Sequence, residues 1–165
     1  MRQDEQAEAA LIRMMHTYGG ALTGMCTMLL RDCHLAQDIV QETFVKAWRN
    51  MGGLRNAASE KAWLCRIAVN LCRDYQRTRW FRLVDRDEEA LSRLPAPDNT
   101  ETSAVLDAIQ GLPQRFREVI LLHYYQGLEP AETAQVLGLS PSAVYRRLRQ
   151  ARARLKPLLE EDSDE

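Results

Sequence analysis

The sequence predicts an all-α protein of two small helical domains joined by a flexible linker, with a helix-turn-helix in the C-terminal domain. Apolar residues recur at spacings of three and four along most of the 165 residues, and no run alternates as a β-strand does. An acidic, proline-containing stretch interrupts this periodicity between residues 83 and 103. We therefore predict domains over 1–82 and 104–159, a linker between them, and a frayed acidic tail over 160–165.

Three helices are expected in the N-terminal domain. The first has one apolar face broken by Gly19–Gly20, so it is one helix or two in series; the face consists of Leu11, Met15, Tyr18, Leu22, Met25 and Leu29. The second is expected over about 35–50 and the third over about 59–79. The Gly52–Gly53 pair predicts a loop between them.

The second helix combines an apolar stripe with a mixed face that is acidic at one end. The stripe consists of Ala36, Val40, Thr43, Phe44 and Ala47, and the opposite face of Asp38, Gln41, Glu42, Val45 and Arg49. An acidic surface beside a basic one does not suit the same DNA. The face therefore favours a protein partner, with plain solvation as the alternative.

The third helix has a buried side and a basic side. Its expected buried stripe consists of Leu64, Ala68, Leu71 and Tyr75, with Cys65 and Cys72 at the margin. The opposite face carries Arg66, Asn70, Arg73 and Arg77. Such a row can follow a phosphate backbone, while Trp63 and the loop with Arg55 and Asn56 can enclose an unpaired base. Alternatively, Trp63 belongs to the core and the arginines are solvated.

Residues 129–155 have the order of a helix-turn-helix: a short helix, a turn at Gly138–Leu139 and a longer basic helix. Ser140 suits the N-cap and Pro141 the first helical position. One side of the last helix carries Val144, Leu148, Ala151 and Leu155, and the other carries Ser142, Tyr145, Arg146, Arg149 and Lys156. Arginines that face outward near a helix N-terminus fit the DNA major groove, although a solvated basic face would have the same pattern.

Charge is segregated along the chain, although the formal net charge is only -1. Basic residues outnumber acidic ones by seven to two over 55–82 and by eight to three over 114–156. Two basic segments suggest two surfaces that face nucleic acid. The N-terminus is polar and no apolar run approaches the roughly 18 residues of a membrane span, so we expect a cytoplasmic protein without membrane insertion.

Nothing in the sequence predicts a catalytic residue, a cofactor or a metal site. Cys26 and Cys33, like Cys65 and Cys72, are seven residues apart, which corresponds to about 10.5 Å along a helix and is too far for a disulfide within either pair. A zinc site would need His34 to converge with distant ligands, without a CxxC motif. We find no nucleophile beside a base, no phosphate loop and no carboxylate dyad.

Three segments, in order, resemble the sigma factors, in their short extracytoplasmic-function group. Residues 36–49 (AQDIVQETFVKAWR) are similar to the family's polymerase-binding segment and residues 62–75 (AWLCRIAVNLCRDY) to its promoter-melting helix, and residues 112–155 resemble its C-terminal domain. The resemblance implies an alternative sigma factor that binds core RNA polymerase and directs promoter-specific initiation. Residues 140–147 (SPSAVYRR) depart from the family's commoner pattern, so the resemblance implies no promoter sequence.

The same resemblance implies partners and site residues. The β′ coiled coil of polymerase would bind Asp38, Gln41, Glu42, Val45 and Arg49, and the β flap is a further expected contact. Minus-ten DNA would meet Arg55, Asn56, Trp63, Arg66, Asn70, Arg73 and Arg77. Minus-thirty-five DNA would meet Ser142, Tyr145, Arg146, Arg149 and Gln150. The linker would run toward the RNA exit path, and an anti-sigma factor is expected as inhibitor.

Two other functions remain open at this point. A stand-alone helix-turn-helix regulator would read a palindrome as a dimer and sense a ligand with its N-terminal half. It would need a dimer face and an effector pocket, which the sequence does not show. A helical enzyme or metal sensor would have to be built on His16, His34 and the cysteines.

Overall fold

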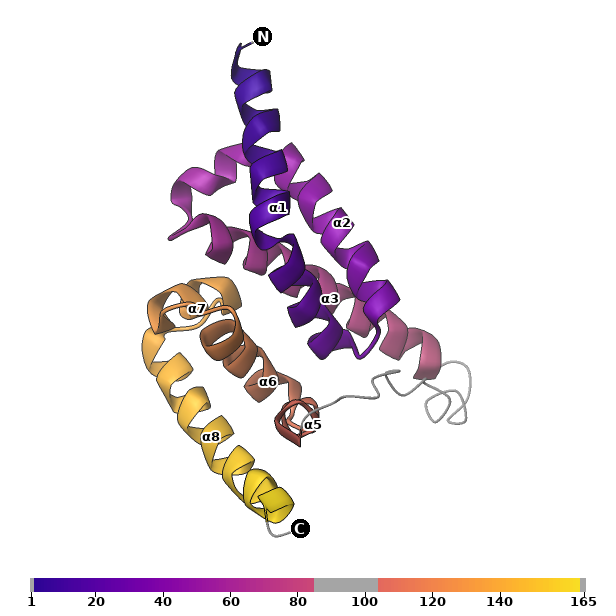
Figure 1. Cartoon of the computed structure of the whole chain (residues 1–165), viewed down its shortest axis with the longest axis vertical. Helices are drawn as coiled ribbons and strands as arrows, with labels where there is room; N and C mark the ends of the chain where they lie inside the picture. Colours follow the sequence, from indigo (N-terminus) through magenta and orange to yellow (C-terminus); the bar gives the residue numbers. More distant parts are fainter. Residues whose placement is uncertain (1, 85–103, 164–165) are drawn as a thin grey trace.

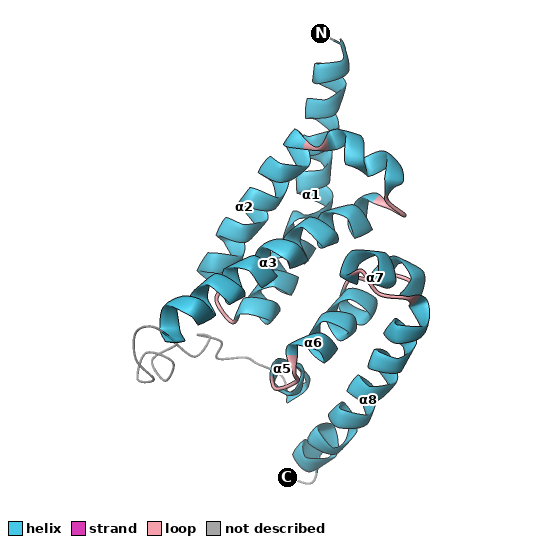
Figure 2. Ribbon diagram, turned by 180° about the vertical axis from the view of Figure 1, so that it is seen from behind, coloured by secondary structure: helices cyan, strands magenta, loops and turns pink. Residues whose placement is uncertain are grey.

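The computed structural model describes residues 2–84 and 104–163, with side chains over 2–79 and 104–160. Most of these residues are helical and none forms a strand. The helices follow in the order α1 (Arg2–Leu30), α2 (Cys33–Arg49), the 3-10 helix η1 (Met51–Asn56), α3 (Glu60–Val84), α5 (Ala104–Gln110), α6 (Gln114–Ile120), the π-helical turn η2 (Leu121–Tyr125), α7 (Pro130–Leu137) and α8 (Pro141–Ser163). Figures 1 and 2 show α1, α2 and α3 as one group and α5 to α8 as another. The prediction of an all-helical chain with two helical regions is confirmed. Most of the predicted linker lies outside the described residues.

Helix boundaries in the N-terminal region follow local chemistry. Helix α1 passes through Gly19 and Gly20 without a break, so the first of the two readings is correct. Helix α2 starts where Asp32 accepts a hydrogen bond from the Leu35 amide at 3.0 Å, which satisfies one free amide of its first turn. The predicted loop after α2 is instead η1, because its backbone closes tight turns such as that from the Gly53 amide to the Asn50 carbonyl.

The cysteines of α3 correct the predicted buried stripe. Cys65 and Cys72 are fully buried at its centre, not at its margin, together with Cys26 of α1. The reason is that α3 packs against α1, α2 and α7, so its buried arc is wider than one partner would require. Burial raises the pKa of Cys65 to about 12. The hydrogen bond with Cys26, together with burial, raises the pKa of Cys72 well above its usual value.

The C-terminal region is a helix-turn-helix supported by α5 and α6. Glu129 and Glu132 form a capping box at the start of α7, and Gly138 ends it with a left-handed φ of 69°. Ser140 caps α8 as predicted, because its hydroxyl accepts from the Ala143 amide at 3.2 Å. Helix α8 continues through Pro157 to Ser163, so residues 160–163 are helical and do not form the predicted frayed tail.

The two regions lie against one another, with α7 on α3 and with α5 and α6 near α1 (Figure 1). Several links between them are polar. The Gln126 side chain is buried and donates to the Ala21 carbonyl at 3.0 Å, and Lys61 donates to the Gln126 carbonyl at 2.9 Å. Periodicity along the chain does not reveal this arrangement, because each region has a complete set of helical patterns by itself.

Candidate nucleic-acid and protein interfaces

The face of α8 that was predicted to meet minus-thirty-five DNA is open to solvent. Its members are all exposed and share one side of the helix: Ser142, Tyr145, Arg146, Arg149 and Gln150. The opposite side is buried through Val144, Leu148 and Ala151. Because one side of α8 is buried, the other side must face solvent. This arrangement lets a recognition helix enter the major groove. Arg154 lies on a different side, where its guanidinium stacks 4.9 Å from the centre of the Phe116 ring.

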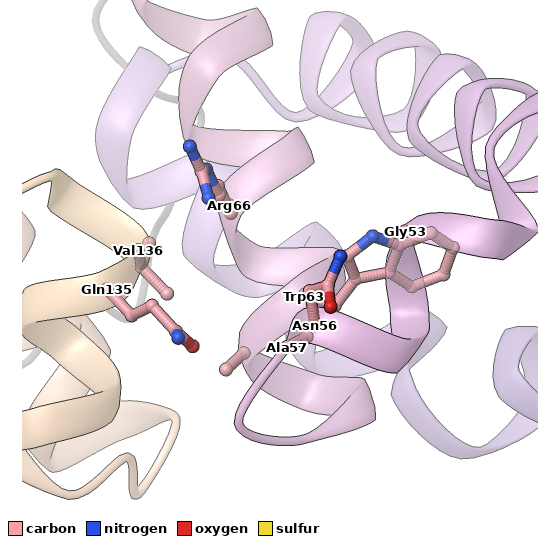
Figure 3. A pocket seen from close by; sticks show the side chains of 8 residues that line it. Gly53, Asn56, Ala57, Trp63, Arg66, Gln135 and Val136 are labelled. Carbon is pink, nitrogen blue, oxygen red and sulfur yellow. The ribbon is translucent and has the colours of Figure 1, made fainter.

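The residues predicted to meet minus-ten DNA lie along η1 and α3, and they differ in exposure. Arg55, Asn56, Arg66 and Asn70 are exposed. Trp63 is buried, with 8% of its surface accessible, so it is mainly a core residue. One side of it still borders a cavity of about 70 Å³. The cavity is lined by Gly53, Asn56, Ala57, Ala62, Trp63, Arg66, Gln135 and Val136 (Figure 3).

Two arginines of the same face have acidic partners. Arg73 forms a two-point ion pair with Glu118 of α6, at 2.7 and 3.0 Å, and the Glu118 side chain is 4% exposed. This hydrogen bond raises the pKa of Arg73 above its usual value, although burial acts in the opposite direction. Arg77 pairs with Asp74 of its own helix at 2.8 Å, where both are exposed. The predicted basic row is therefore divided, because Arg73 faces the C-terminal region.

The predicted protein-binding face of α2 is exposed and borders an apolar groove. Its residues Asp38, Gln41, Glu42, Val45 and Arg49 all face solvent. The groove runs between α1 and α2, has a volume of about 820 Å³ and is lined by Glu8, Leu11, Ile12, Met15, Gly19, Thr23, Val40, Gln41, Phe44, Val45 and Trp48. The α1 side and Trp48 were missed in the sequence. A clue was present, because Val45 and Trp48 are large apolar residues on the polar side of α2.

Other kinds of site find no support in the part of the chain that the structure describes. No group of three or more metal-ligating side chains is placed to hold an ion there. His16, His34 and Cys33 are exposed, and the remaining three cysteines are buried. Among the described helices, none has the length and apolar character needed to cross a membrane.

Known proteins resemble the chain in both regions. The family model for sigma-70 region 2 matches residues 14–82, and the model for sigma-70 region 4 matches residues 102–155. The ECF RNA polymerase sigma factor SigL of Mycobacterium tuberculosis is 31% identical over 163 residues, which cover 94% of this chain and 92% of SigL. The probable RNA polymerase sigma factor RfaY of Xanthomonas campestris is 32% identical over 155 residues, which are 87% of this chain but 39% of RfaY.

A solved structure agrees over almost the same span. CnrH in complex with the cytosolic domain of CnrY superposes with a TM-score of 0.69 and 31% identity, covering 96% of each chain. Two region models in the expected order, and a relative matched over nearly its full length, do not fit a stand-alone helix-turn-helix regulator. This chain belongs to the extracytoplasmic-function sigma factors of the sigma-70 family, alternative sigma factors that direct transcription initiation and are not themselves catalysts.

Proposed function

We propose that this chain binds core RNA polymerase through α2, engages the minus-ten element at η1 and α3, and reads the minus-thirty-five element with α8. The observation that carries this proposal is the separation of three outward-facing surfaces on one fold. The α2 face is acidic at one end and borders an apolar groove, whereas the other two surfaces are basic. Complementary charge favours a protein partner for the first and nucleic acid for the other two. The chain itself would catalyse no reaction and would act in the cytoplasm.

The polymerase surface is expected to comprise the predicted α2 residues and the groove beside them. Gln41 and Val45 belong to both, so the two surfaces are continuous. A helix of the β′ coiled coil would place apolar side chains beside Met15 and Trp48, which are 47% and 42% exposed. Asp38 and Glu42 would meet basic groups at the edge of the contact. The β flap would contact region 4.

An inhibitory protein partner is also expected. The relative CnrH has been solved with the cytosolic domain of CnrY. An inhibitor of this chain that covers the α1–α2 groove would compete with polymerase, because the groove includes residues of the proposed polymerase surface. The proposed path of the linker toward the RNA exit channel concerns residues outside those that the structure describes.

Run-off transcription with core polymerase tests the proposal. Genomic fragments are transcribed with and without the chain, and discrete new transcripts are expected only when both proteins are present. The variant Asp38→Lys/Glu42→Lys should abolish them without loss of helicity. The matched control Asp4→Lys/Glu5→Lys makes the same charge change on exposed residues of α1 outside the groove and should remain active. Normal transcription by the first variant would refute the polymerase surface. A tight footprint without polymerase would refute the proposed function.

A further inference from the structure

Tyr124 and Arg152 form a hydrogen bond on the surface of region 4, between the π-helical turn η2 and α8. The Arg152 guanidinium donates through Nη1 to the Tyr124 hydroxyl at 2.8 Å. Both residues are exposed, and neither belongs to the set that the sequence predicts to meet DNA. We propose that Arg152 binds a backbone phosphate of the minus-thirty-five duplex and that Tyr124 is a positioning residue that orients its guanidinium. The inference rests on the proposed role of α8 at the minus-thirty-five element.

The place of Arg152 on α8 puts it beside the proposed base-reading face. Residues three, four and seven apart share one side of a helix, so Arg152 lies on the side of Tyr145 and Arg149, and the exposed Lys156 continues that side. Arg152 is about 10.5 Å farther along the helix axis than Tyr145. A recognition helix contacts bases with its N-terminal residues, and its C-terminal end can contact the DNA backbone. Arg152 is therefore placed for a phosphate and not for a base edge.

The Arg152 guanidinium has donors and charge left for such a contact. A guanidinium carries five N–H donors, and the bond to Tyr124 uses one of them. Among the residues that the structure describes, no carboxylate lies within ion-pair distance of Arg152, whereas Arg73 and Arg77 of α3 each have an acidic partner. The remaining donors have the fork geometry that matches two phosphate oxygens. DNA can therefore bind this cation without displacing a protein carboxylate.

Tyr124 is itself held in place by η2, which continues α6 alongside α8 (Figure 2). The Gln126 amide donates to the Leu121 carbonyl at 2.9 Å, five residues back, which is the wide turn of a π-helix. His123 donates through Nδ1 to the Leu128 carbonyl at 2.8 Å, which fixes its imidazole ring. That ring meets the Tyr124 ring edge to face, with 4.8 Å between the ring centres. The Tyr124 hydroxyl is thus supported at one position beside α8.

The chemistry of the pair favours orientation of Arg152 over a purely structural role. An exposed hydrogen bond competes with water and contributes little to folding stability. An arginine loses rotamer freedom when it binds, however, and a bond formed beforehand reduces that loss at the moment of contact. Tyrosine suits this task because its side chain is rigid and its hydroxyl accepts from a cation without carrying a negative charge. Tyr124 therefore orients Arg152 and leaves its positive charge available to phosphate.

The two roles make different predictions for DNA binding. Loss of a phosphate contact weakens binding about equally on all sequences and lowers its salt dependence. Arg152→Ala should therefore reduce affinity about tenfold and lower the slope of log K against log salt concentration by about 1. Tyr124→Phe removes only the hydroxyl, so it should reduce affinity about threefold and leave the slope unchanged. In the Arg152→Ala background, Tyr124→Phe should have no further effect, because Tyr124 acts through Arg152.

Holoenzyme binding to promoter DNA tests these predictions. Core polymerase is assembled with each full-length chain and titrated onto a fluorescein-labelled duplex promoter at several salt concentrations, with intact and altered minus-thirty-five sequences. Arg154→Ala and Tyr125→Phe are the matched controls and should stay within about twofold of wild type. Arg154 is an exposed arginine of α8 that stacks on Phe116, and the exposed Tyr125 has its hydroxyl beside Gly24 of α1. The fold-loss for Arg152→Ala should be the same on both promoters.

Several outcomes would overturn the proposal. A wild-type salt slope for Arg152→Ala would exclude the phosphate contact, and failure of this variant to assemble with core polymerase would assign Arg152 to a protein contact. A further loss from Tyr124→Phe in the Arg152→Ala background would show that Tyr124 binds DNA itself. Arg152→Lys retains the charge and should restore the slope, and Arg152→Gln decides if circular dichroism shows that Arg152→Ala does not fold. If wild-type holoenzyme binds no promoter, the proposed function fails and this inference with it, whereas equal binding by wild type and Arg152→Ala refutes this inference alone.

Discussion

The two surfaces proposed to meet promoter DNA differ in how far the fold leaves them free. On α8 the proposed residues are exposed, and Tyr145 is 55% exposed. At η1 and α3, α7 lies over the cavity beside Trp63, and Arg73 is paired with Glu118. Amphipathicity within one helix is enough to present the first surface, but the second depends on where a distant helix lies. Helices α6 and α7 of region 4 therefore contact part of the second surface, and we see no reciprocal cover on α8 in the described residues.

The largest effect is expected at the open surface. On promoters that depend on the minus-thirty-five element, Arg149→Ala should weaken apparent promoter binding by about 1–3 kcal/mol and lower transcription accordingly. The reason is that the proposed arginine contact with a base edge is lost. Run-off assays on promoters with intact and scrambled minus-thirty-five sequences measure it. Arg154→Ala is the control, since Arg154 stacks on Phe116. An equal loss on both promoters would reduce Arg149 to a phosphate contact.

A smaller effect is expected at the covered surface. Asn56 is exposed and lines the cavity, so Asn56→Ala should remove a base contact worth about 0.5–1.5 kcal/mol in promoter melting. Permanganate reactivity of unpaired thymines, with polymerase present, reports this step. Asn50→Ala changes an exposed amide just before η1 that does not line the cavity and should melt promoters normally. Equal promoter melting by Asn56→Ala and wild type would show that the Asn56 side chain in this cavity does not bind the unpaired base.

A pH effect is expected at the ion pair between Arg13 and Glu60, which joins α1 to the start of α3. Arg13 of α1 binds Glu60 at the start of α3 at 2.6 Å, and this hydrogen bond lowers the pKa of Glu60 below the ordinary 4.5. The stabilisation is present above about pH 4.5 and is lost as pH falls through the lower value in the folded state. Urea midpoints between about pH 6 and pH 3 should fall less for Glu60→Gln than for wild type. Arg13→Met should reproduce this result, and an unchanged slope would contradict it.

The smallest net effect is expected for Gly24→Ala in α1. An alanine Cβ there would collide with the Tyr125 hydroxyl of region 4. Tyr125 is 51% exposed and can rotate away, so the contact between α1 and region 4 should loosen. Alanine also favours the helix by about 0.5–1 kcal/mol over glycine, which offsets that cost in the thermal midpoint. Scattering should show a slightly larger radius of gyration with nearly unchanged stability. Gly20→Ala is the control, because its Cβ would meet nothing within 4 Å.

How much the sequence predicts depends on the range of the interaction. The buried and open sides of α8 follow from residues three and four apart, as does the cap at Ser140, so the pattern identifies them. The central position of Cys72, the groove beside Met15 and the pairing of Arg73 with Glu118 arise from segments far apart in the chain. The spacing of apolar residues within one helix does not show which other helix packs against it. Trp63 illustrates the limit of sequence-based prediction, since a tryptophan fits both a hydrophobic core and a site that stacks on a base.

Arg73 pairs with Glu118 and is also proposed to contact DNA, and this combination affects how such a protein can diverge. Arg149 is exposed, so its substitution would change only the proposed contact of α8 with DNA, and promoter preference could shift there in small, independent steps. A substitution at Arg73 would remove the proposed promoter contact and the cation paired with Glu118 at the same time. The second change leaves a buried carboxylate without its cation, which favours a compensating change on α6. We therefore expect the exposed face of α8 to tolerate substitutions more readily during evolution, and Arg73 and Glu118 to be substituted together.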